Sequence, residues 1–427
     1  MRHRNIAVLA LTGAVVAGLA AGCGGSSKKS GGSGGSGGGG DERGPITYVQ
    51  GKDNNNVVPG LVQRWNAAHP NEKVTAKQQS DSADDQLQDD EQHFQSKDSG
   101  YDVVSVDVIW TAEFAAKQWL VPLKDKYALD TGKLLPATVK AATYNGTVYA
   151  GPASSDGGLL YYRKDLVPNP PANWSELIAD CSKKSGTVTG CYAGQYANYE
   201  GLTVNVAEAI NAAGGVFVKE DGKTPAVDSP ESRTGLDFLV NGFKQGYIPK
   251  EAIGYKETES LQAFQTGKLL FLRNWPYAYN ILSTDPSSVV KGKFGIAPLP
   301  GPKGQGASSL GGHSLAISQF SKHKQTALDF IKFYESAEMQ TYFLNQGSQA
   351  PVLSATYADP ALTAKYGYLS TLLKSIETAV PRPVTPFYPA VTKAIETNAY
   401  AALQGNKSTD QAIKDMQAAL QAATGGG

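Results

Sequence analysis

The sequence predicts an α/β fold built in two lobes. Between residues 45 and 119, strand-like segments alternate with amphipathic helical segments, which is the rhythm of a parallel sheet wrapped by helices. The residues from about Asp41 to Thr424 are too many for one hydrophobic core and suit two. A strand expected at 268–273 must stop at Asn274-Trp275-Pro276, because proline offers no donor to a sheet.

Each element of the first half rests on its own local pattern. The first helix has apolar residues at helical spacing, the pattern of a helix docked on a sheet. A Tyr-Asn-Gly-Thr sequence suits a hairpin turn. The expected elements are strands at 45–49, 74–78, 101–106 and 159–162, a helix with Val58, Leu61, Val62 and Trp65, a helix at 82–96, a helix capped by Thr111 that carries Phe114 and Trp119, and a hairpin within 140–149.

The second half continues with helices, strands and a final pair of helices. Ser408 and Gln411 form a capping box that should begin the last helix. The expected elements are helices beginning at Trp174 and at 202–213 and 231–246, strands at 294–300 and 311–317, a helix with Ala327, Phe330, Ile331 and Tyr334, and a helix striped by Val391, Ile395, Ala399 and Ala402.

Trp275 follows a buried strand directly, with Tyr277 and Tyr279 behind it. In open α/β sheets, ligands bind at the carboxyl ends of strands. Trp275 is therefore a candidate ligand platform, although this stretch alone fits a core tryptophan equally well.

The N-terminus has the pattern of an export signal. Residues 1–4 are basic, residues 6–21 are apolar, and small residues precede Cys23. The apolar run is short for a membrane span. The small-small-Cys ending resembles the lipobox of bacterial lipoproteins, except that Ala20 stands where leucine is usual. The resemblance implies a signal peptide at 1–22 and a Cys23 acylated with palmitate; a plain signal peptide with a free Cys23 is the alternative.

The acylated Cys23 and a Gly/Ser tether together make up residues 23–43, and such a sequence cannot form a core. We therefore expect the folded part to be extracytoplasmic and lipid-anchored to the outer face of the cell membrane. The formal net charge is zero and no basic cluster lies beyond the tether, which argues against a nucleic-acid partner. Of three cysteines, Cys181 and Cys191 remain to pair, and an exported protein favours a disulfide between them.

Five blocks of sequence resemble one family in the same order. They are DVVSVDVIWTAEFAAKQWLVPL at 102–123, GPASSDGGLLYYRKDLVPNPPANWSEL at 151–177, AFQTGKLLFLRNWPYAY at 263–279, LGGHSLAIS at 310–318 and PRPVTPFYPAV at 381–391. These blocks resemble the extracellular solute-binding proteins of ABC sugar importers, in the branch of maltose- and trehalose-binding proteins (solute-binding family 1).

The resemblance implies a two-lobe fold of the periplasmic-binding-protein type (type II), in which the chain crosses the hinge between lobes more than once. The N-terminal lobe would comprise 44–152 plus 307–347, and the C-terminal lobe 153–306 plus 348–424. A di- or oligosaccharide would bind in the cleft as the lobes close. The protein would be a monomer that delivers this sugar to ABC permease subunits in the membrane. No enzyme activity, cofactor or metal is expected.

A sugar site needs acceptors for hydroxyl groups and a flat ring beneath C–H faces. Asp107 comes directly after a buried strand. The resemblance implies that its carboxylate binds the hydroxyl groups of the sugar. Glu257 matches a carboxylate of the family, although Glu259 could take that role. Trp110 fits either the cleft or a position packed behind Asp107. The predicted ligand-binding residues are Asp107, Asp156, Glu257, Trp275, Gly312, Arg382, Trp110, Tyr388, Gln78 and Asp53.

Two positions depart from the pattern of the family. His313 stands where relatives often have tryptophan, and Gln78 stands where several have a charged residue. A smaller or more polar ligand than a disaccharide is therefore an open alternative.

Two other classes of protein compete with this interpretation. A lipid-anchored glycoside hydrolase would need two carboxylates astride a bond; Glu257 and Glu259 are candidates by their pairing alone, and nothing in the sequence resembles a hydrolase motif. A structural envelope lipoprotein would have no ligand that raises its melting temperature.

Overall fold

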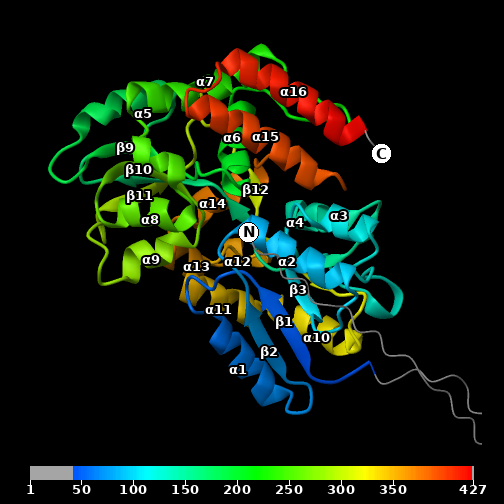
Figure 1. The fold of residues 1–427 in the computed structure, drawn as a ribbon. Coiled ribbons are helices and arrows are strands. Elements are labelled where there is room, and N and C mark those ends of the chain that lie inside the picture. The colour runs from blue at the N-terminus through cyan, green and yellow to red at the C-terminus, as the bar shows by residue number, and fades with distance from the viewer. Residues whose placement is uncertain (1–41, 426–427) are drawn as a thin grey trace, which may run out of the picture. The chain divides into compact units, whose positions relative to one another are not determined.

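The computed structural model describes residues 42–425 (Figure 1). The described residues belong to one compact unit. The predicted signal peptide at 1–22, Cys23 and the tether up to residue 41 lie outside the described residues.

A five-stranded sheet is formed mainly by the first part of the chain. Its strands are ordered β2-β1-β3-β13-β6, with β1, β2 and β3 parallel and β13 antiparallel to both of its neighbours. The bounds are β1 Ile46–Gln50, β2 Val74–Gln78, β3 Val103–Asp107, β6 Ala150–Pro152 and β13 His313–Ile317.

Alternating side chains place a hydrophobic core on each face of this first sheet. Val103, Leu315 and Ile317 lie on one face, in the cluster that includes Trp65 and Phe330. Val104 and Val106 lie on the other, with Phe94 and Phe114. Helices therefore cover both faces, as predicted. The helices around this sheet are α1 Val58–Ala68, α2 Ala83–Gln95, α3 Thr111–Ala116, α4 Pro136–Ala141, α10 Lys324–Tyr334 and α11 Ala337–Gly347.

A second, four-stranded sheet has the order β11-β8-β10-β9. Only β9 and β10 run parallel, while β8 is antiparallel to both β10 and β11. Strands β7 and β12 form a separate two-stranded ladder. Each lies in the sequence between a strand of the first sheet and a strand of the second. The bounds are β7 Asp156–Gly157, β8 Leu159–Arg163, β9 Gly190–Ala193, β10 Leu269–Asn274, β11 Phe294–Ala297 and β12 Leu310–Gly311.

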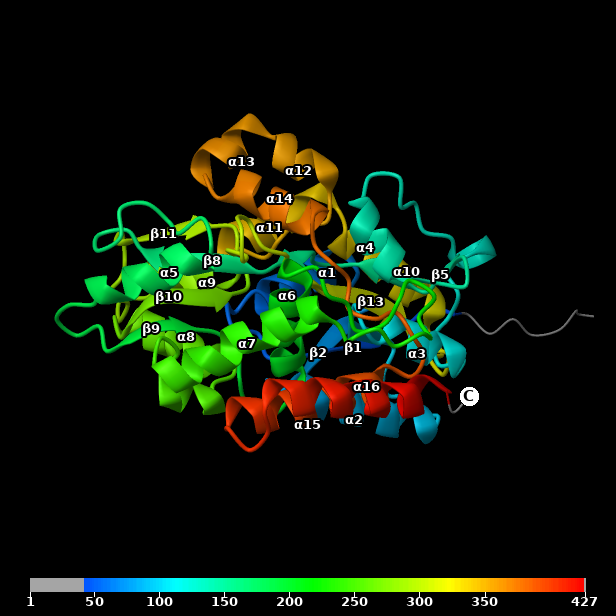
Figure 2. The ribbon, with the colours of Figure 1, turned by 90° about the horizontal axis from the view of Figure 1, so that it is seen from above.

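Ten helices belong to the second part of the described chain and pack into its hydrophobic core. The last two, α15 and α16, run side by side (Figures 1 and 2). The bounds are α5 Trp174–Asp180, α6 Glu200–Ala212, α7 Pro230–Gln245, α8 Glu257–Gln265, α9 Ala278–Thr284, α12 Ser354–Ala358, α13 Pro360–Lys365, α14 Leu369–Glu377, α15 Tyr388–Leu403 and α16 Thr409–Gly425.

Two local predictions, the disulfide and the hairpin, are confirmed, and the predicted capping box is half formed. Cys181 and Cys191 form a disulfide. The hairpin pairs β4 (Thr143–Tyr144) with β5 (Thr147–Val148), and its two turn residues, Asn145 and Gly146, both have positive φ. The Ser408 hydroxyl accepts a hydrogen bond from the Gln411 amide at 3.2 Å, although the Gln411 side chain bonds Asp415 instead of completing the capping box.

Two predictions need correction. The sheets are mixed rather than parallel, because β13 enters the first sheet antiparallel to β3. The predicted helix after Thr111 ends at Ala116 and does not carry Trp119, because the chain turns at Gln118, whose φ is 59°. Trp119 nevertheless packs on the same core, with its ring 5.6 Å from that of Phe114.

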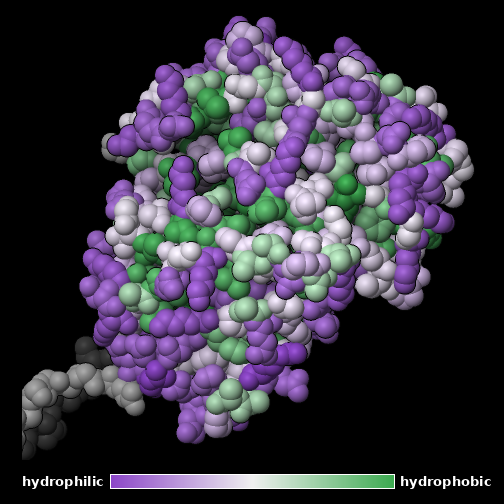
Figure 3. Space-filling model, turned by 180° about the vertical axis from the view of Figure 1, so that it is seen from behind, coloured by the Kyte–Doolittle hydropathy of each residue, from purple (hydrophilic) through white to green (hydrophobic). Residues whose placement is uncertain are grey.

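The surface visible from behind is dominated by hydrophilic residues, with hydrophobic ones set between them (Figure 3). Four large hydrophobic side chains of the described residues are exposed, and they come from separate segments of the chain: Ile178, Val216, Val289 and Val384. Within residues 42–425, no helix combines the length and the apolar character that crossing a bilayer requires.

Candidate functional site

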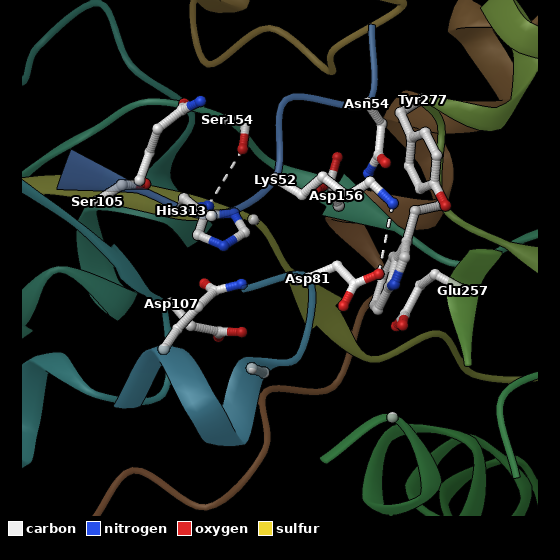
Figure 4. A pocket seen from close by; sticks show the side chains of 18 of the residues that line it. Lys52, Asn54, Asp81, Ser105, Asp107, Ser154, Asp156, Glu257, Tyr277 and His313 are labelled. Carbon is white, nitrogen blue, oxygen red and sulfur yellow. Dashed lines mark hydrogen bonds and ion pairs between the residues drawn. The ribbon is translucent and has the colours of Figure 1, made fainter. Parts of the chain in front are cut away.

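A polar cavity of about 240 Å³ lies where ends of the two sheets meet. The first-sheet side contributes the loop after β1 and the end of β3. The second-sheet side contributes the segment after β10 and the first residues of α6 and α8. Figure 4 shows Asp107, Asp156, Glu257 and His313 around this space. Of the predicted residues, those lining it are Asp53, Asp107, Asp156, Glu257, Trp275, Gly312 and Arg382.

A buried charge bridge joins the two sides of the cavity. One Arg382 nitrogen lies 3.2 Å from the Asp107 carboxylate at the end of β3, and the other lies 2.5 Å from the Glu200 carboxylate at the start of α6. Burial alone would lower the pKa of Arg382, but Asp107 and Glu200 raise it above its usual value. Burial raises the pKa of Glu200, and Arg382 opposes that rise. Arg382 therefore stays charged and orients both carboxylates.

Asp156 presents a carboxylate that no described residue bonds. It lines the cavity from β7, and no donor among residues 42–425 makes a hydrogen bond to its side chain. Burial and the negative charge of Asp107 raise the pKa of Asp156 to about 7, while Arg273 opposes the rise. The carboxylate is thus free to accept hydrogen bonds from a ligand.

Glu257, and not Glu259, is the carboxylate of α8 that reaches the cavity. Its Oε2 accepts a hydrogen bond of 2.6 Å from the Tyr199 hydroxyl, and burial raises the pKa of Glu257. Glu259 is exposed and accepts a bond of 3.0 Å from the Lys256 amide, closing the first turn of the helix. The geometry therefore does not support Glu259 as the ligand-binding carboxylate in place of Glu257.

Trp275 lies in the cavity wall with its indole partly exposed. Its ring stacks on Arg273, whose Cζ lies 3.8 Å from the ring centroid. The side chain is therefore placed at the cavity and not in the hydrophobic core.

Asp53 and Gly312 line the cavity but also have structural tasks. The Asp53 carboxylate accepts hydrogen bonds from the amides of Val57 at 3.0 Å and Val58 at 2.8 Å, so it stabilises the start of α1. Gly312 has a φ of 109°, and a Cβ there would lie 2.2 Å from the Ser154 carbonyl oxygen. Only glycine fits this junction between β12 and β13.

Three predicted residues do not line the cavity. Trp110 is 2% exposed, because it begins α3 and packs with Phe114 in the core. Tyr388 is also buried, and its hydroxyl donates a hydrogen bond of 2.6 Å to the Glu200 carboxylate. Gln78 is exposed at the end of β2 and accepts a bond from the Asp53 amide at 3.2 Å. For Trp110, the structure matches the alternative of packing behind Asp107.

Several lining residues were not among the predicted ligand-binding residues. Tyr199 and Glu200 open an otherwise buried helix, and an acidic residue in a first turn is usually explained by the helix alone. Tyr277 follows Trp275 and could have been inferred from that spacing. His313 pairs with Asp107 between β13 and β3, and burial lowers its pKa. It forms part of the cavity wall, at the position where the resemblance to the family would place a tryptophan.

Direct contacts also cross the cavity rim. The Asn280 side chain of α9 donates a bond of 2.9 Å to Asn55, in the loop after β1. On another part of the rim, the Asp84 carboxylate of α2 accepts a bond of 3.2 Å from the Glu200 amide. These contacts and the Arg382 bridge hold the two sides together around the space. Among the described residues, no group of three or more His, Cys, Asp or Glu side chains is placed to hold a metal.

Comparison with known proteins gives a consistent result. The family described as "Bacterial extracellular solute-binding protein" matches residues 51–341. A "Probable ABC transporter-binding protein" of Deinococcus radiodurans is 31% identical over 79% of this chain and 83% of its own length. A "Mannitol-binding protein" of Pseudomonas aeruginosa is 28% identical over 74% of this chain and 79% of its own.

A solved structure supports the same assignment. The structure "Maltose bound T. maritima MalE3" superposes with a TM-score of 0.84 at 33% identity, covering 88% of this chain and 99% of that one. The predicted α/β fold of the periplasmic-binding-protein type is therefore confirmed. The family consists of binding proteins and not of enzymes. This chain belongs to the family of bacterial extracellular solute-binding proteins.

Proposed function

We propose that this protein captures a neutral sugar of the maltose or trehalose type and delivers it to an ABC permease. In this proposal the lobes are 44–152 plus 307–347 and 153–306 plus 348–424, and they close on the sugar. Acylation of Cys23 would anchor the protein to the outer face of the membrane, as a monomer. The curated relative of D. radiodurans is named as an ABC transporter-binding protein, and the similar solved structure holds maltose.

The observation that carries the proposal is the combination of a partly exposed indole with open carboxylates in one cavity. Trp275 offers a flat face to sugar C–H groups. Among residues 42–425, no donor bonds the Asp156 side chain, and the Glu257 carboxylate accepts from the Tyr199 hydroxyl and keeps further acceptor positions, so both can accept bonds from sugar hydroxyls. An apolar ligand would leave the Asp156 carboxylate buried without a partner, which is costly.

The size of the sugar is a separate question. His313 in the cavity wall replaces a stacking ring, and one relative is named for an open-chain polyol, mannitol. A smaller polyhydroxy ligand is therefore the second candidate within the same class of solute.

The test is a thermal-shift screen of the purified protein with maltose, trehalose, glucose and mannitol, followed by calorimetry of each ligand that shifts the melting temperature. We expect at least one sugar to bind and Trp275→Ala to weaken it by about 1–3 kcal/mol. Trp119→Ala removes a partly buried indole outside the cavity and should leave the affinity unchanged. No shift with any of the four would refute the proposal, and release of glucose from maltose would favour a hydrolase.

A further inference from the structure

Arg273 lies beneath the indole of Trp275. It comes from β10, two residues earlier, and its Cζ is 3.8 Å from the ring centroid. Trp275 lines the cavity, whereas Arg273 is 1% exposed and does not. The guanidinium therefore covers the face of the indole that points away from the cavity, which leaves the opposite face for a ligand.

The guanidinium itself is held rigidly. Its Nε and Nη2 donate to the two carboxylate oxygens of Glu208, on α6, at 2.7 and 2.5 Å. Its Nη1 donates to the Gln195 side chain at 3.0 Å. A bidentate pair of this kind fixes the plane of the guanidinium as well as its position. A buried ion pair is weak evidence for stability, because desolvation offsets its attraction, so its geometry calls for another explanation.

The rest of Trp275 is also fixed. The Tyr161 hydroxyl donates to the Trp275 carbonyl at 2.8 Å, and the Asn274 side chain accepts from the Trp275 amide at 2.7 Å. Gly311 leaves room for the ring, since a Cβ there would lie 2.8 Å from the indole Cζ3. The backbone of Trp275 is therefore held by hydrogen bonds, while the edge of its ring lies against Gly311 and the rear face of the ring lies against Arg273.

We propose that Arg273 is a positioning residue that presets the Trp275 indole for ligand stacking and never touches the ligand. This inference rests on the proposed function only for the identity of the ligand. A planar cation stacked on the rear face holds the ring by cation–π attraction. A preset ring avoids the entropy that a mobile side chain loses when it binds. Arg273 thus acts on affinity through Trp275 alone.

The central experiment is a double-mutant cycle with maltose as the probe. Arg273→Met is combined with Glu208→Leu, because a lone Glu208 would stay buried without its partner and could prevent folding. We expect this pair to weaken maltose binding roughly tenfold, and to change it less than about twofold when Trp275→Ala is already present. An equal loss in both backgrounds would show that Arg273 acts independently of the indole, and would overturn the inference.

A control pair lies on the neighbouring strand. Arg163 in β8 makes the same kind of two-point contact with Asp165, at 2.8 and 2.7 Å, but away from Trp275. Arg163→Met with Asp165→Ala should leave the maltose affinity unchanged. A loss equal to that of the Arg273 pair would assign the effect to the sheet and not to the indole.

A second readout needs no ligand. The emission of Trp275 is obtained as the difference between each protein and its Trp275→Phe counterpart, and acrylamide quenching of this difference reports the freedom of the ring. We expect the quenching constant to rise about twofold in the Arg273 pair, because the rear face loses its cover. Unchanged quenching would overturn the inference. Failure of the unmodified protein to bind maltose would instead count against the maltose proposal, and quenching would still decide the role of Arg273.

Discussion

Asp156 shows how the cavity differs from an ordinary protein surface. Its carboxylate has no bonding partner among the described residues, and its pKa is raised to about 7 by burial and by Asp107. Because the folded state holds its proton more tightly than the unfolded state, this group favours folding at low pH. That contribution is present below about pH 4 and is lost as the pH rises through about 7.

Asp156→Asn should therefore stabilise the ligand-free protein at pH 8 relative to the unmodified protein, and should have little effect at pH 4. The measurement is the melting temperature of both proteins between pH 4 and 8. Asp221→Asn is a suitable control, since the pKa of Asp221 is lowered and its side chain lies on an exposed turn. A difference that does not vary with pH would contradict the expectation.

At the scale of elements, the junction of β12 and β13 connects the two-stranded β7–β12 ladder to the first sheet. Gly312 adopts a backbone conformation that other residues avoid, against the Ser154 carbonyl. The residues on either side of Gly312 position two cavity carboxylates, because Gly311 pairs with Asp156 and His313 pairs with Asp107.

Gly312→Ala should lower the free energy of unfolding by about 2 kcal/mol or more, through strain and the clash with Ser154. Gly304→Ala serves as the control, because nothing lies within 4 Å of a Cβ at that site. Chemical denaturation measures both variants. Equal stability of the two would show that the junction tolerates a side chain.

The disulfide is a second local constraint, joining the end of α5 to β9. Neither cysteine lines the cavity. Replacing both with serine should lower stability by about 2–4 kcal/mol and leave ligand affinity unchanged. Denaturation with and without reductant, together with calorimetry, separates these two effects, and a loss of affinity would contradict the separation.

At the scale of the whole described chain, hydrogen bonds cross the cavity rim. Asn55 and Asn280 make such a contact without a charge, at 2.9 Å. If the two sides separate in the absence of ligand, this bond should favour the closed arrangement.

Asn55→Ala should then increase the radius of gyration of the ligand-free protein in small-angle scattering and weaken maltose binding severalfold. Asn406→Ala is the control, because Asn406 is exposed and its side chain bonds only that of Gln404 among the described residues. An unchanged radius with unchanged affinity would show that the Asn55 contact does not influence closure.

The sequence was sufficient for local structure and for part of the cavity. Periodicity located most helices and strands, and strand ends located Asp107 and Trp275. Glu200 could not be found this way, because its importance comes from Arg382, 182 residues away. Trp110 looked equally suited to the cavity and the core, and only the packing of α3 against the first sheet decides between them. Contacts between residues far apart in the sequence leave no local pattern, so periodicity and spacing cannot predict them.

The Asp107–Arg382–Glu200 bridge also bears on the order in which the protein is built. Its partners are separated by 182 and 275 residues, and the strand β13, at 313–317, is needed to join β3 to β6. A chain still emerging from the ribosome or the export channel therefore has neither a finished first sheet nor a joined cavity. Contacts of such sequence separation form slowly. The protein becomes competent to hold a ligand only after nearly all of the chain has been delivered to the compartment where it folds.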